Sequence, residues 1–142
     1  MTVTLFTLDG TRMETDRVLE ASADWQAGSP AAQFSAVLPG ENWPEELVTV
    51  RWKDDSGFTL FEGYLDTAAQ VLDSDGPRLE VTARSAGCYL LDNEALPQSY
   101  DSVTLDSFCQ RYLDSYGIFR RGFSYRGRLP YTVPKGQSEW EA

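Results

Sequence analysis

The sequence contains no histidine, and its 142 residues include only two cysteines, Cys88 and Cys109. Protein zinc sites are built mainly from histidine and cysteine, and the usual catalytic serine or cysteine gives its proton to an imidazole. The two cysteines also do not form a CxxC pair. We therefore predict no metal, no cofactor and no catalytic residues, and we interpret both cysteines as buried, reduced thiols.

Basic residues and long apolar stretches are also scarce. Twelve Lys and Arg face 22 Asp and Glu, which gives a formal charge of −10. Phosphate binding takes its affinity from clustered Lys and Arg, so we expect no specific nucleic-acid partner. The chain has neither a run of roughly 20 apolar residues nor a basic N-terminus followed by an apolar stretch. These absences predict a soluble protein without a membrane partner, made in the cytoplasm.

Apolar and polar residues alternate with a period of two through much of the first two-thirds of the chain, as expected for strands that bury one face. The alternation covers residues 18–25, 33–38, 48–53, 58–72 and 78–84, with turn sequences between them. Trp25 and Trp52 fit this pattern as core residues. Gly63, in the middle of a long strand, indicates a bulge or a close approach of two backbones. Roughly six strands at this spacing predict a small closed or nearly closed β-barrel domain over residues 1–97.

The period changes to that of a helix after residue 103. Six apolar residues recur at helical spacing: Leu105, Phe108, Cys109, Tyr112, Leu113 and Tyr116. Thr104 is the expected N-cap, and Gly117 the glycine that ends the helix. The final residues, GQSEWEA, have the composition of a helix start, and a single turn is unstable by itself. We therefore expect residues 98–142 to be the beginning of an α/β domain in a truncated chain, and the fold class to be mainly β with α+β character.

Four segments in this order carry a family resemblance. They are ELVTVRWKDDSGFTLFEGYLDTAAQVL, RLEVTARSAGCYLLDNEAL, SVTLDSFCQRYLDSYGI and GQSEWE. Together they resemble the N-terminal region of phage tail baseplate hub proteins, the late-control family, over residues 18–142. The segment RRGFSYRGR departs from the family pattern, and the second barrel typical of these hubs is missing.

This resemblance implies a structural protein and no enzymatic activity. Three copies would form a homotrimeric ring, with tail tube proteins on one side and the spike protein on the other. The expected location is the virion tail of a phage or phage-like particle, reached from the host cytoplasm during assembly. An acidic lumen would let DNA pass without binding, because phosphates are repelled.

Two groups of residues are candidates for an interface. A basic aromatic segment contains Arg120, Arg121, Phe123, Tyr125, Arg126, Arg128 and Tyr131. Such a segment can meet an acidic protein surface or stack on single-stranded bases, and the overall charge favours the protein partner. A solvated loop is the alternative. Trp43 and Trp140 are candidate anchors, although Trp43 can equally be a plug over the end of the barrel.

Other functional interpretations rest on carboxylates in predicted turns. The pairs Asp54–Asp55 and Glu45–Glu46 could serve a glycosidase as acid and base, but adjacent turn carboxylates are normally solvated. The DSDG sequence at residues 73–76 matches the start of a calcium loop, whose glutamate at position 12 would fall at Arg84, so a plain turn is favoured. The alternative function is a small-barrel binding module of the carbohydrate-binding or OB type.

Overall fold

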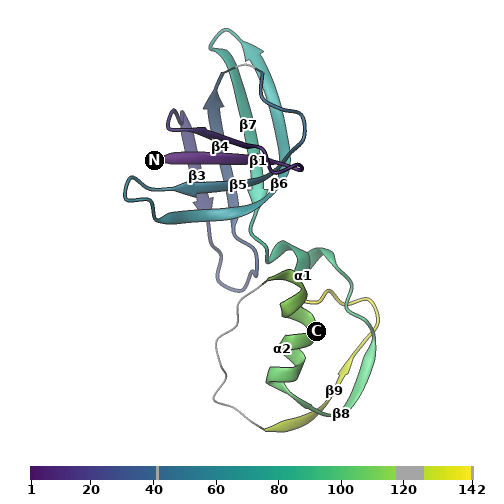
Figure 1. Ribbon diagram of the computed structural model, residues 1–142. Coiled ribbons are helices and arrows are strands. Elements are labelled where there is room, and N and C mark those ends of the chain that lie inside the picture. Colours follow the sequence, from purple (N-terminus) through teal and green to yellow (C-terminus); the bar gives the residue numbers. More distant parts are fainter. Residues whose placement is uncertain (41, 118–126, 142) are drawn as a thin grey trace. The chain divides into compact units, whose positions relative to one another are not determined.

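The computed structural model describes residues 1–40, 42–117 and 127–141, in two compact units (Figure 1). The β unit is Met1–Ser85 and the α+β unit is Ala86–Ala142. The division predicted from the sequence followed residue 97, so residues 86–97 belong with the second unit rather than with the strands before them. Each unit is described separately.

The β unit is one antiparallel sheet of seven strands in the order β2-β1-β5-β6-β7-β4-β3. Its strands are β1 (Thr2–Thr7), β2 (Arg12–Thr15), β3 (Glu20–Asp24), β4 (Gln33–Pro39), β5 (Leu47–Lys53), β6 (Thr59–Asp73) and β7 (Gly76–Arg84). The alternation indicated β3 to β7 but not β1. Strand β1 was not assigned from the sequence, although Thr2, Val3, Thr4 and Leu5 alternate, and in the structure Val3, Thr4 and Leu5 are all buried.

The sheet is open, and the prediction of a closed barrel is not confirmed. The strand order starts at β2 and ends at β3, and no ladder joins these two strands within the described residues. Both edge strands are short and carry charged residues, Arg12 and Glu14 on β2 and Glu20 and Asp24 on β3. Short, charged edges disfavour further strand pairing, which is the physical reason why the sheet stops there.

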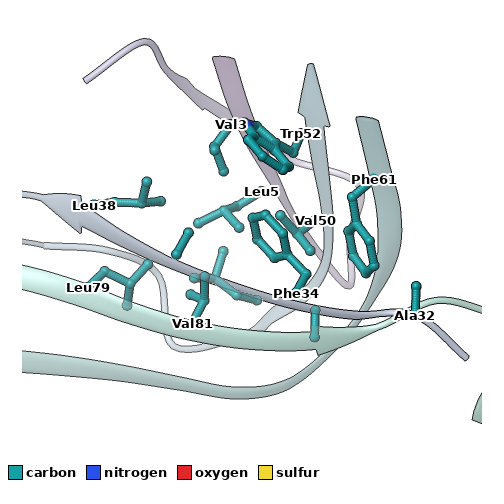
Figure 2. Packing of buried hydrophobic residues seen from close by; sticks show 13 residues of the cluster. Val3, Leu5, Ala32, Phe34, Leu38, Val50, Trp52, Phe61, Leu79 and Val81 are labelled. Carbon is teal, nitrogen blue, oxygen red and sulfur yellow. The ribbon is translucent and has the colours of Figure 1, made fainter. Parts of the chain in front are cut away.

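The sheet curls so that the inner faces of its strands enclose one core (Figure 2). The buried cluster consists of Val3, Leu5, Ala32, Phe34, Ala36, Leu38, Leu47, Val50, Trp52, Phe61, Leu79, Val81 and Ala83. The Phe34 ring stacks on Phe61 at 4.9 Å between centroids and meets Trp52 at 5.6 Å. Trp52 is buried as predicted. Trp25 is 62% exposed because it follows Asp24, the last residue of β3 paired with β4, so its assignment to the core was wrong.

Gly63 marks a close approach of two backbones, as predicted. A Cβ atom at this position would lie 2.3 Å from the carbonyl oxygen of Arg84 and 2.8 Å from the Phe61 ring. Two residues further, the register of β6 against β7 shifts between Leu65 and Thr67. The long strand therefore changes direction where it has no side chain to obstruct β7.

The α+β unit contains α1 (Cys88–Asp92), β8 (Gln98–Thr104), α2 (Leu105–Leu113), the 3₁₀ turn η1 (Asp114–Tyr116) and β9 (Arg128–Val133). Strands β8 and β9 form a two-stranded antiparallel sheet. The predicted helix is confirmed with both of its ends. The Thr104 hydroxyl accepts a hydrogen bond from the Ser107 amide at 3.1 Å, and Gly117 has a φ of 66°. Neither cysteine forms a disulfide within the described residues, and Cys88 is buried whereas Cys109 is half-buried.

The last described residues, Ser138 to Glu141, have the hydrogen bonds of a helix start. The Glu141 carboxylate accepts from the Ser138 amide at 3.0 Å, and the Glu141 amide donates to the Ser138 hydroxyl at 3.4 Å. This reciprocal pair is a capping box. The Trp140 amide donates to the Leu90 carbonyl at 2.9 Å, which ties the segment to α1.

Tyr112 is the largest residue in the core of the α+β unit, where Ala95 and Val133 are also buried. Its ring lies 4.6 Å from Phe108, and its hydroxyl lies 3.4 Å from that of Tyr100. Burial, together with the Tyr100 hydroxyl, raises the pKa of Tyr112 to about 12. The neutral phenol is therefore the form that the folded unit holds.

We expect Gly63→Ala to destabilise the β unit by about 2 kcal/mol or more, because the new methyl group must displace β7 backbone rather than a flexible side chain. Gly57→Ala is the control: Gly57 has a φ of 86° and open space around it, so only backbone strain of about 1 kcal/mol is added. Urea unfolding followed by circular dichroism measures both. Equal losses in the two variants would contradict the close approach.

We also expect Tyr112 to ionise late. Because the folded pKa of Tyr112 lies above its ordinary value, the stability it contributes is present below pH 10 and is lost as the pH rises from about 10 toward 12. Absorbance at 295 nm should show a late titrating component that Tyr112→Phe removes while retaining the ring contacts. The control is Tyr64→Phe, at a half-exposed tyrosine of the β unit, which should leave that component in place.

Candidate functional site

The interface residues predicted from the sequence divide into two groups. Five of them, Arg120, Arg121, Phe123, Tyr125 and Arg126, lie outside the described residues. Arg128 is exposed in β9, where it pairs with Thr104 of β8. Trp140 is 48% exposed in the α+β unit, and Trp43 belongs to the β unit. These described residues belong to two different units, and their role in an interface stays a prediction.

Trp43 packs against the edge of the β-unit core. Its side chain is half-buried on the core cluster, and its indole nitrogen is buried without a hydrogen-bond partner in the described part of the chain. The Gln70 side-chain amide donates to the Trp43 carbonyl at 2.8 Å, which fastens the loop to β6. This geometry is that of a plug. A role for Trp43 as an interface anchor stays a prediction.

The carboxylates of the predicted turns are held by local hydrogen bonds. Asp54 accepts from the amides of Ser56 and Phe58, each at 2.9 Å, and from the Ser56 hydroxyl. The hydroxyl contact, followed by these amides, lowers the pKa of Asp54. The sequence interpretation expected an ordinary pKa here. A lowered pKa makes the residue a poorer general acid, so the arrangement does not favour glycosidase chemistry.

The DSDG sequence forms the turn between β6 and β7, with Gly76 at a φ of 97°. Asp73 accepts from the Asp75 amide at 3.0 Å and pairs with Arg78 at 2.6 Å. The contact with Arg78, followed by the Asp75 amide, lowers the pKa of Asp73. Arg78 also pairs with Glu80 at 2.9 Å, so the turn charges are engaged with one another.

A polar ladder crosses the outer face of four neighbouring strands. Ser22, Ser35, Thr82 and Thr67 lie in register across β3, β4, β7 and β6. The Ser22 and Ser35 hydroxyls are 2.9 Å apart, and those of Thr67 and Thr82 are 2.7 Å apart. Beside the ladder, Arg84 pairs with Asp66 at 2.9 Å. Sequence reasoning missed this ladder, whose signal is the small hydroxyl residues at outward positions of the alternating strands.

The ladder borders a shallow hollow of about 360 Å³. Its lining is Ser22, Asp24, Gln33, Phe34, Ser35, Asp66, Thr82, Ala83 and Arg84. Most of its polar side chains already have a hydrogen-bond or ion-pair partner. Asp24, for example, accepts a hydrogen bond from Gln26, outside the lining, at 3.0 Å. Ligand sites present polar groups that still seek a partner, whereas this surface is largely satisfied. The hollow therefore gives little support to a small-ligand site.

The β6–β7 hairpin reaches beyond the other strands of the sheet (Figure 1). Strand β5 pairs with β6 only as far as Tyr64, whereas β7 accompanies β6 to Asp73. The residues of β6 beyond Tyr64 therefore have one strand neighbour instead of two. Most are exposed, including Leu72, which is 79% exposed. This part of β6 is therefore an open length of sheet edge.

The α+β unit has an apolar cavity of about 290 Å³ between β8, α2 and β9. Val103, Thr104, Leu105, Phe108, Gly127, Leu129 and Tyr131 line it. Phe108 meets Tyr131 edge-on at 5.5 Å. Leu105 and Leu129 are exposed at this place, so the cavity is open. The described residues contain no group of three side chains suited to a metal ion, and none of their helices is long and apolar enough to span a membrane.

The comparison with solved structures finds a likeness in fold. No protein-family model matches the chain, and no curated protein matches it in sequence. The fold is similar to the crystal structure of the tail protein from Neisseria meningitidis MC58, with a TM-score of 0.73 and 15% identity. The likeness covers 99% of this chain, and the chain spans 42% of the Neisseria protein. Both units of the chain are therefore included in a fold that also occurs in a tail protein.

Proposed function

We propose that this chain is a structural part of a phage or phage-like tail. The observation that carries the proposal is the structural likeness to the Neisseria tail protein, which extends over nearly the whole chain and includes both units. Four sequence segments also resemble segments of baseplate hub proteins, and they follow one another in the order that these hubs have. Two independent kinds of similarity thus favour the same class of assembly. Fold alone does not fix function, so an experiment must decide.

Within such a tail, we propose the role of the baseplate hub. Three copies form a ring between the tail tube and the spike, and the protein reaches the virion tail after synthesis in the host cytoplasm. The β unit would build the wall of this ring. Residues 1–85 contain fifteen Asp and Glu against six Lys and Arg, so most of the negative charge of the chain belongs to this unit. A ring wall of this sign repels DNA and lets it pass.

The structure also supports a structural role through the state of its polar groups. The outer-face hydroxyls pair across strands, and Arg51, Arg78 and Arg84 each pair with a carboxylate of the same sheet. Such pairs fix the positions of neighbouring side chains on the surface of the sheet. Catalysis, by contrast, uses groups that stay available to a substrate. The absence of enzymatic activity, cofactor and metal remains a prediction.

The first experiment measures the solution mass of the chain across a concentration series, by light scattering after size exclusion. We expect a species of three times the 15.9 kDa chain mass to grow with concentration. Ring formation depends on mass action, so dilution should reverse it. A mass of one chain at every concentration would contradict ring assembly by these residues.

The second experiment tests the location. An antibody raised against the chain is used for immunogold electron microscopy of particles induced from the strain that encodes it. We expect gold at one end of each tail, and about three copies of the chain per particle by quantitative mass spectrometry, as a ring of three requires. Labelling along the whole tube, or particles without label, would contradict the hub role.

A further inference from the structure

Three stretches of sheet edge in the β unit differ in how they are protected. Strand β2 has four residues, including Arg12 and Glu14, and β3 has five, including Glu20 and Asp24. The third stretch is the part of β6 beyond Tyr64, where β5 no longer pairs. Natural sheets protect their edges with short strands and charged residues. Between Asp66 and Asp73, the β6 edge has the sequence Thr-Ala-Ala-Gln-Val-Leu, which contains no charge.

The hydrogen bonds of β7 show which backbone groups of β6 face outward. At the two ends of the β4–β7 ladder, the Gly40 amide donates to the Pro77 carbonyl and the Ser85 amide donates to the Ala32 carbonyl, both at 3.0 Å. Odd-numbered residues of β7 therefore bond to β4. Because bonding directions alternate along a strand, the even-numbered residues Arg78, Glu80 and Thr82 bond to β6.

The opposite residues of β6 follow from the register. Arg78, Glu80 and Thr82 lie opposite Val71, Ala69 and Thr67, which therefore point their amides and carbonyls toward β7. The residues between them, Ala68, Gln70 and Leu72, direct their backbone groups away from β7. All three are exposed. The Gln70 contact with Trp43 uses the side-chain amide and not the backbone.

The charges around this edge indicate what kind of strand fits it. Asp66, Asp73, Asp75 and Glu80 belong to the hairpin, against Arg78 and Arg84. The β unit as a whole is strongly acidic. A second copy aligned antiparallel on the same edge would bring together two hairpins that each carry four carboxylates against two arginines, and like charges repel each other. A strand with basic residues at its ends would instead be attracted by the negative charge of the hairpin.

We propose that the outer edge of β6, from Ala68 to Leu72, binds an extended segment of a different protein that carries Lys or Arg at its flanks, by adding that segment to the sheet as an eighth strand. Main-chain hydrogen bonds to Ala68, Gln70 and Leu72 give the affinity, and the net negative charge of the hairpin and of the β unit favours a basic segment. The proposal rests on the sheet alone and stands whether or not the chain belongs to a tail.

Nuclear magnetic resonance of the ¹⁵N-labelled chain tests the edge directly. In the free chain, the amides of Ala68, Gln70 and Leu72 should exchange with solvent faster than those of Thr67, Ala69 and Val71. The probe is a short synthetic peptide of alternating threonine and valine with a lysine at each end. Its addition should shift the three outward amides and slow their exchange. The same peptide with glutamate at each end should bind at least about tenfold more weakly.

Two controls separate strand addition from other binding. Ala68→Pro removes one outward amide without touching the bonds to β7, and proline is tolerated at an open edge; it should abolish the peptide-induced shifts. Ala68→Thr retains the amide and should leave them. Methylating the backbone nitrogens that face β6 on the lysine peptide should also abolish binding, and this control does not depend on how well a variant folds.

Three results would overturn the proposal. One is equal binding of the lysine and glutamate peptides, and another is equal binding of the methylated and unmethylated peptides. The third is protection of Ala68, Gln70 and Leu72 that appears without peptide and grows with chain concentration. That result would assign the edge to a second copy of the chain.

Discussion

The β unit depends on the way β6 passes from one neighbour to another. Its first half pairs with β5 and its second half only with β7, so the strand must turn between them. Gly63 makes this possible, because any side chain there would meet the Arg84 carbonyl. The register shift at Asp66 completes the turn, and the Asp66–Arg84 ion pair lies across it. The curl that brings Phe34, Phe61 and Trp52 together follows from this change of partner.

Sequence patterns predicted much of the fold because each half-buried strand and the helix α2 bury one face only. The Thr104 cap, the Gly117 terminus and the role of Gly63 were readable because each rests on local backbone geometry. Other features depend on distant neighbours. Thr4 of β1 is buried although it holds a polar position of the alternation, and Trp25 lies just past the end of a ladder, so neither burial state follows from the local pattern. Closure of the sheet was wrongly inferred because strand spacing does not report whether β2 and β3 meet.

The candidate surfaces were less predictable for the same reason. Interface residues were sought among aromatic and basic side chains. In the structure, Trp43 packs on the core of the β unit, whereas Trp140 and Arg128 belong to the α+β unit. Between Asp66 and Asp73, the open part of β6 contains only uncharged residues, which no motif search selects. Its character comes from the lengths of the two neighbouring strands. A strand of ordinary composition becomes a candidate site because β5 ends before it does.

Charge gives the surfaces their different uses. An acidic β unit repels both nucleic acid and other copies of itself, so any stable association must overcome that repulsion through apolar or main-chain contacts. Arg78 and Arg84 pair with Asp73 and Asp66 at the two ends of the uncharged β6 edge, and the hairpin still carries two more carboxylates than arginines. The edge therefore combines exposed main-chain groups with a net negative charge around them. The short, charged edges of β2 and β3 lack that combination, and this difference makes one edge of the sheet suited to binding while the others stay closed to it.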